Sequence, residues 1–153
     1  MIFEFKKMTQ DNALIIANQW KYEGIYAFYD MTADIEDYNE FVNEELRNKN
    51  DVYEALVNKE LVGFFCLSRK GTTLDIGLGL KPNMCGKGLG KDFLTQILNF
   101  IEQHYTYEKL TMSVATFNKR AIKVYQACGF KDNGIVKQYS NDGIYEFLNL
   151  IKP

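Results

Sequence analysis

The stretch Cys85-Gly86-Lys87-Gly88-Leu89-Gly90-Lys91 joins a short apolar run, residues 76–80, to a long amphipathic helical pattern that begins near Gly88. Its three glycines allow the backbone to approach a ligand closely, and the free amides that open a helix attract an anion. Lys87 and Lys91 add positive charge at the same place. The stretch therefore predicts a phosphate or pyrophosphate site on a loop between a strand and a helix.

Two common phosphate-binding loops do not fit this spacing. In a Walker A loop that ends at Gly90-Lys91, the first glycine would fall at Cys85 and the required hydroxyl at Asp92. A Rossmann fingerprint that begins at Gly86 would need a third glycine where Lys91 stands. The loop also follows two strands of antiparallel pattern, which does not match the start of a βαβ unit. A nucleoside triphosphate site is thus disfavoured, and competition by ATP would reveal one.

A second segment, residues 118–130, reads Asn-Lys-Arg-Ala-Ile-Lys-Val-Tyr-Gln-Ala-Cys-Gly-Phe. It resembles the Asn-x-x-Ala-x-x-x-Tyr-x-x-x-Gly-Phe segment of the GNAT superfamily of acyl-CoA N-acyltransferases. Residues 85–90 resemble that family's Gln/Arg-x-x-Gly-x-Gly/Ala loop, with Pro82 just before it. The resemblance covers residues 51–151, and the first 50 residues match in general pattern only. The chain departs from the family at Cys85, where Gln or Arg is usual.

The resemblance implies an α/β fold of the GNAT type, which is a central mixed, mostly antiparallel sheet with helices on both faces. It also implies a single domain over residues 1–153. Hydrophobic periodicity agrees, because it predicts the element order β-αα-βββ-α-β-α-ββ. The expected strands are residues 2–7, 52–57, 61–67, 73–80, 110–114, 130–139 and 144–151. Two expected helices follow caps at Thr9 and Asp34, and the second is a single helix that carries apolar residues as far as Leu46. A third covers residues 88–104, and a fourth runs from Asn118 to a C-terminal Gly129.

Composition limits the function classes. A net charge of −2 argues against a broad nucleic-acid surface, and no apolar run approaches the roughly 18 residues that a membrane span needs. The three cysteines have neither metal-ligand nor disulfide spacing, and the first residues do not read as a secretion signal. We therefore expect a cytoplasmic protein without a metal, a nucleic-acid partner or a membrane partner. The basic residues that gather near the two motifs are Lys81, Lys87, Lys91, Lys119, Arg120 and Lys123.

The resemblance implies acetyl-CoA as co-substrate. Leu78 and Leu80 would pair with its pantetheine arm like an extra strand, and the loop would bind its pyrophosphate. Gly77 and Gly79 fit a close ligand approach, and the alternative is that they mark a bulge. Arg120 and its lysine neighbours either reach the ribose phosphate or form a solvated helix face. The candidate cofactor-binding residues are Leu78, Leu80, Cys85, Gly86, Lys87, Gly88, Gly90, Lys91, Asn118 and Ala121.

The same resemblance makes Tyr125 the candidate general acid, because a phenol can donate a proton to a thiolate leaving group. The alternative is a core tyrosine whose hydroxyl lies at the edge. The general base is less defined, and Asp75 is the nearest carboxylate on the strand before the loop. Ser113 stands where certain relatives carry a glutamate. Other candidate bases are Glu23, Glu54 and Glu146.

These patterns together predict an N-acetyltransferase that moves an acetyl group from acetyl-CoA to a primary amine by direct attack in a ternary complex. The acceptor would be a small molecule or a protein N-terminus. The aromatic-rich residues 20–29 would wall the acceptor site, or would form a packed core between two helices. The alternative function is a catalytically silent acyl-CoA-binding sensor. Exposed strand edges near the last hairpin would permit a homodimer.

Overall fold

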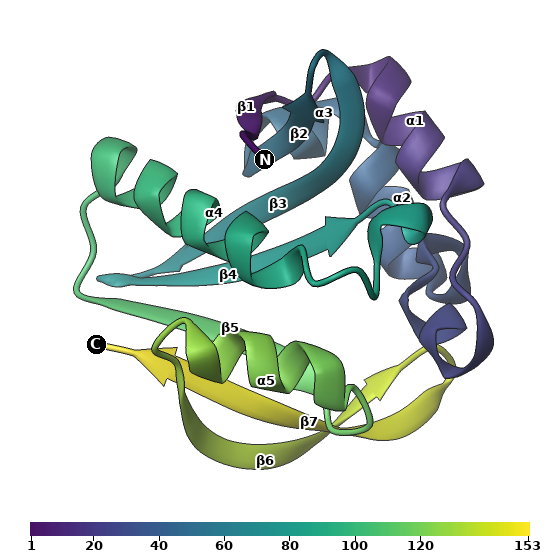
Figure 1. Cartoon of the computed structure of the whole chain (residues 1–153). Helices are drawn as coiled ribbons and strands as arrows, with labels where there is room; N and C mark the ends of the chain where they lie inside the picture. Colours follow the sequence, from purple (N-terminus) through teal and green to yellow (C-terminus); the bar gives the residue numbers. More distant parts are fainter.

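The structure is a computed structural model that describes residues 1–153, and its centre is a seven-stranded sheet. The strands are β1 (Glu4–Lys7), β2 (Asp51–Val57), β3 (Glu60–Lys70), β4 (Thr73–Leu80), β5 (Lys109–Ala115), β6 (Lys131–Ser140) and β7 (Gly143–Lys152). Their order in the sheet is β1-β2-β3-β4-β5-β7-β6 (Figure 1). Only β4 and β5 pair in parallel. The predicted mixed, mostly antiparallel sheet is confirmed.

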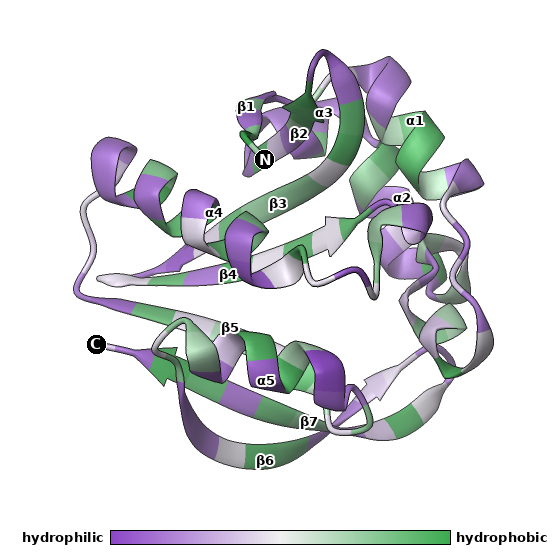
Figure 2. Ribbon diagram, in the orientation of Figure 1, coloured by the Kyte–Doolittle hydropathy of each residue, from purple (hydrophilic) through white to green (hydrophobic).

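Helices cover both faces of this sheet. The helices are α1 (Gln10–Gln19), α2 (Ile35–Val42), α3 (Glu44–Asn48), α4 (Gly90–His104) and α5 (Lys119–Ala127), with 3₁₀ turns η1 (Gly24–Tyr29), η2 (Met31–Ala33) and η3 (Pro82–Met84). The larger apolar cluster joins the sheet to α4 and α5, and a smaller one joins it to α1 and α2. Figure 2 shows that α4 is apolar on one side and hydrophilic on the other. No helix combines the length and the apolar character that a membrane crossing requires.

Most of the predicted caps and turns are present. The side chains of Thr9 and Asp34 accept hydrogen bonds from the amides of α1 and α2, and Gly129 follows α5 with a φ of +98°. Asn58 and Asn141 each open a tight hairpin turn in the left-handed region. The single helix expected after Asp34 is wrong, because the chain breaks at Asn43, whose side chain caps α3.

The structure explains why positions 77 and 79 are glycines, and the explanation is neither of the two that the sequence suggested. A Cβ on Gly79 would lie 2.5 Å from the ring of Phe64, and one on Gly77 would lie 3.0 Å from the sulfur of Cys66. The pairing of β3 with β4 runs through both positions without a bulge. The two glycines therefore make room for side chains of β3 on the α1 side of the sheet.

Candidate active site

A cavity opens where two central strands separate. The parallel pairing of β4 with β5 ends at Asp75 and Thr111, and beyond this pair the strands diverge (Figure 1). The cavity has a volume of about 440 Å³. Its walls come mainly from five parts of the chain. These are residues 76–80 of β4, residues 112–114 of β5, the glycine-rich loop, the first turns of α5, and the aromatic segment between α1 and η2.

One edge of β4 is turned toward this cavity. The amide of Lys81 donates to the carbonyl of Val62 on β3 at 2.8 Å. Because backbone groups alternate sides along a strand, the amides of Leu78 and Leu80 face the separated β5 side instead. The carbonyl of Leu80 accepts a hydrogen bond from the hydroxyl of Tyr22 at 2.8 Å. The strand thus offers unpaired backbone groups to an extended ligand at Leu78.

The glycine-rich loop forms the next wall. Gly86 and Gly88 have φ values of +72° and +76°, which L side chains rarely adopt. Gly90 begins α4 and lies against Val124 of α5, so that a Cβ there would stand 3.4 Å from that side chain. The thiol of Cys85 lies 3.6 Å from the carbonyl oxygen of Leu80, and burial raises the pKa of this thiol. The loop therefore presents backbone amides and an uncharged side chain.

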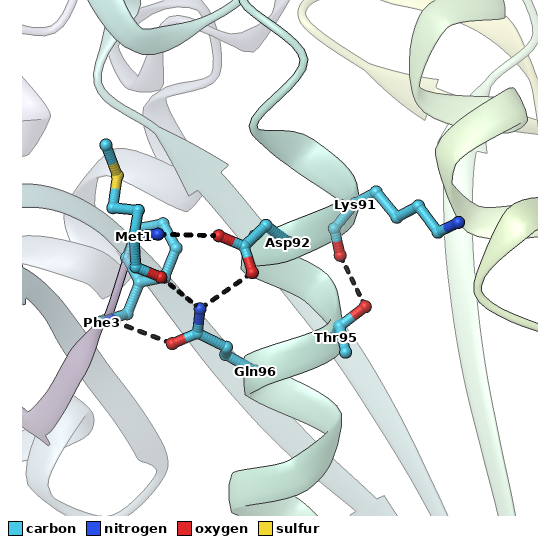
Figure 3. A network of polar contacts seen from close by, with 6 residues as sticks. All are labelled: Met1, Phe3, Lys91, Asp92, Thr95 and Gln96. Carbon is cyan, nitrogen blue, oxygen red and sulfur yellow. Dashed lines mark hydrogen bonds and ion pairs between the residues drawn. The ribbon is translucent and has the colours of Figure 1, made fainter.

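The first turn of α4 is held in place from behind. The side-chain amide of Gln96 donates to Asp92 at 2.9 Å and to the carbonyl of Met1 at 2.7 Å, and it accepts from the amide of Phe3. In Figure 3 the side chain of Lys91 extends away from this group of residues. Neither Lys91 nor Lys87 lines the cavity. The contacts of Gln96 fix the helix start, and with it the direction of the loop amides.

Helix α5 and its N-cap bring three of the sequence-predicted residues into the cavity, Asn118, Ala121 and Tyr125. Asn118 caps the helix by accepting from the amide of Ala121 at 3.1 Å, and its side-chain NH₂ donates to the hydroxyl of Tyr29 at 3.3 Å. Ala121 lies about one turn after Asn118 and Tyr125 nearly two turns after it, and both line the cavity. Burial raises the pKa of Tyr125 above its ordinary value, and the nearby Tyr29 adds to the rise. Tyr125 is therefore a neutral hydrogen-bond donor.

The aromatic segment divides between core and cavity. Trp20 is buried and packs 6.2 Å from the ring of Phe64, centroid to centroid. Tyr22, Tyr26 and Tyr29 also line the cavity, but with hydroxyl-bearing rings. The individual contacts of Tyr22 and Tyr29 had no local sequence signal, because their partners lie 58 and 89 positions away.

The candidate bases lie outside the cavity walls. Asp75 accepts a hydrogen bond from the hydroxyl of Thr111 at 2.8 Å, and burial raises the pKa of its carboxyl. Glu54 is buried and accepts from the amide of Thr9. Glu23, Asp75, Glu54 and Glu146 are all absent from the lining, whereas Ser113 is part of it. Arg120 is the only charged side chain that lines the cavity.

Comparisons with known proteins agree with this geometry. A family model described as the acetyltransferase (GNAT) family matches residues 15–130. The N-alpha-acetyltransferase RimI of Mycobacterium tuberculosis is 29% identical over 103 residues, which cover 63% of this chain and 63% of that protein. The match therefore spans less than two thirds of that relative's own length.

Two solved structures show the same fold at low sequence identity. One is a chimera of the spermidine N-acetyltransferase SpeG from Vibrio cholerae with hSSAT, with a TM-score of 0.78 and 19% identity over 98% of this chain and 94% of that chain. The other is the aminoglycoside acetyltransferase AAC(6')-Ib in complex with coenzyme A, with a TM-score of 0.73 and 18% identity over 97% of this chain and 94% of that chain. At these low sequence identities the similarity shows a shared fold only.

Proposed function

The chain belongs to the GNAT family of acetyltransferases, and from this premise we propose that it is an acetyl-CoA-dependent acyltransferase. It transfers an acetyl group from acetyl-CoA to a primary amine, on a small molecule or at a protein N-terminus, by direct attack in a ternary complex. The observation that carries this proposal is the single cavity that gathers the β4 edge, the glycine-rich loop and Tyr125.

The residues of the cavity fit acetyl-CoA, which would supply the acetyl thioester. The amides of residues 86–90 suit the pyrophosphate, because unpaired amides at a helix start bind anions. Leu78 and Leu80 suit the pantetheine arm, whose amides can pair with a strand edge. An amide of β4 at this edge would also polarise the thioester carbonyl by stabilising charge on its oxygen. Asn118 and Ala121 line the same cavity.

Tyr125 would donate a hydrogen bond to the sulfur that leaves. A thiol has a pKa of about 8.5, and the pKa of Tyr125 is raised above that of a free phenol, so complete proton transfer to the thiolate is uphill. Hydrogen bonding to the developing thiolate is favourable without complete transfer. Tyr22 and Tyr29, which also line the cavity, would hold the acceptor amine by cation–π contact before it loses its proton. Asp75 stays the predicted base, and from its position it would act through water.

A silent acyl-CoA sensor is the second candidate, favoured by Cys85 at the loop position where the family usually has Gln or Arg. A single experiment that combines thermal unfolding with a thiol-release assay distinguishes the two functions. Thermal unfolding is followed with acetyl-CoA, coenzyme A or ATP, and thiol release is then measured against a panel of amines. A ligand at 100 times its Kd stabilises by about 2.7 kcal/mol. We expect stabilisation by both coenzyme A species but not by ATP, and thiol release with at least one amine. Stabilisation without release would favour the sensor, and no stabilisation would contradict both.

The pH dependence of turnover should reflect the raised pKa of Tyr125. Since a raised pKa keeps the phenol neutral to higher pH, the donor form is present throughout the alkaline range. We expect kcat to rise as the acceptor amine deprotonates and then to stay level up to at least about pH 10, the value at which a free tyrosine ionises. Initial rates from pH 6.5 to 10.5 measure this. A decline that begins near pH 9 and is absent in Tyr125→Phe would contradict the assignment.

A further inference from the structure

Arg120 connects three walls of the cavity. It belongs to the first turn of α5, and its guanidinium carbon lies 4.4 Å from the centroid of the Tyr26 ring. One terminal nitrogen lies 3.0 Å from the place that a Cβ on Gly86 would occupy. The side chain therefore reaches from α5 across the mouth of the glycine-rich loop to the aromatic segment.

The guanidinium is positioned for an anion and has none in the protein. Arg120 takes part in none of the four ion pairs of the structure. Its guanidinium carbon lies over the face of the Tyr26 ring, a contact that uses none of its N–H groups as hydrogen-bond donors. Those N–H groups form a planar fork of donors, the geometry that binds phosphate oxygens in pairs. The positive charge also acts on the loop itself, because it lowers the pKa of Cys85 against the effect of burial.

We propose that Arg120 binds the pyrophosphate of acetyl-CoA and replaces the side chain that the loop lacks at Cys85. This inference rests on the proposed use of acetyl-CoA. All three side chains are exposed, but the two loop lysines do not line the cavity, whereas Arg120 lines it and lies beside Gly86. The charge that the loop sequence omits is thus supplied from a helix that begins 34 positions later. Because Tyr26 already holds the guanidinium in place, less conformational entropy of this side chain is lost when the ligand binds.

The test measures affinity by calorimetry with three probes, which are coenzyme A, dephospho-coenzyme A and pantetheine. Hydrogen bonds to charged groups are worth enough that Arg120→Ala should weaken coenzyme A binding by roughly 10- to 100-fold. The same factor is expected with dephospho-coenzyme A, which keeps the pyrophosphate but lacks the 3′-phosphate. No change is expected with pantetheine, which has neither. Lys137→Ala, which removes an exposed cation of β6 outside the cavity lining, is the control and should change each affinity by less than about threefold.

The replacement itself is tested by moving the side chain back to the loop. Cys85→Arg, or Cys85→Gln where the first variant unfolds early, should restore most of the lost affinity in the Arg120→Ala background. A loss confined to coenzyme A would place Arg120 on the 3′-phosphate and overturn the proposal. Double variants that melt like wild type but bind no better than Arg120→Ala would overturn the replacement. Wild-type protein that binds no coenzyme A would instead remove the proposed function, which separates the two failures.

Discussion

Tyr125→Phe is expected to lower kcat by about 10²- to 10³-fold while it leaves the affinity for acetyl-CoA within about twofold. The substitution removes one hydroxyl and keeps the ring that packs between α5 and the core. That hydroxyl would act on the leaving sulfur, and its hydrogen bond strengthens only as negative charge develops there. The raised pKa of Tyr125 makes it a weak acid. We therefore place the expected loss of kcat in the lower part of the range that general acids contribute. Steady-state kinetics with acetyl-CoA and one active amine, together with calorimetry, measure both quantities.

The matched control is Tyr29→Phe, which removes a neighbouring hydroxyl from the same cavity. Tyr29 bonds to Asn118 and faces the aromatic side of the cavity, so its loss should change kcat by less than about tenfold. A Tyr125→Phe enzyme that keeps more than a third of wild-type kcat would contradict the donor role. A chain without turnover before the substitution would have nothing to lose, and this outcome would favour the sensor. The comparison of the two tyrosines therefore tests the role and the function together.

Local patterns were sufficient for most of the fold. Caps, tight turns and alternating strands depend on neighbours within four residues, and Thr9, Asp34 and Gly129 all act where the sequence places them. The break at Asn43 was missed, because an apolar helical pattern continues through it to Leu46. Tertiary contacts decide such breaks, and the buried Arg47 of α3 supplies one by donating to the side-chain oxygen of Gln10 in α1, 37 positions away, at 2.5 Å.

Site residues that belong to one continuous motif could be predicted from the sequence. Contacts between residues of separate segments could not. The glycine-rich loop and the helix with Tyr125 reach the same cavity as expected. Asp75 stays outside the cavity because it is the last residue of β4 that pairs with β5 and it accepts a hydrogen bond from Thr111, a partner that no local pattern indicates. Arg120 could be named as basic but not assigned a partner. Its neighbours Tyr26 and Gly86 lie in two other segments, and only folding brings the three together.

The largest expected effect on stability is that of Phe93→Ala, which should lower the free energy of unfolding by about 3–5 kcal/mol. Phe93 has an exposed fraction of 0%, and its ring centroid lies 5.0 Å from that of Phe3 and 6.4 Å from that of Phe5. A Cβ on Gly63 would stand 2.8 Å from the end of this ring, so β3 is shaped around it. The total free energy of unfolding of a small domain is only about 5–15 kcal/mol, so this loss is a large share of it. Urea unfolding at fixed pH measures it.

Phe93 also lines the cavity in the first turn of α4, immediately after the glycine-rich loop. The contacts of Gln96 hold this turn from the other side, so Phe93 and Gln96 together fix where the loop amides point. Phe93→Ala should therefore weaken acetyl-CoA binding as well, although it removes no group that contacts the cofactor. Phe93→Leu, which keeps most of the volume, should cost less than half as much stability and leave the affinity nearly unchanged. Equal losses of stability from the two variants, or full cofactor affinity in Phe93→Ala, would show that this ring does not position the loop.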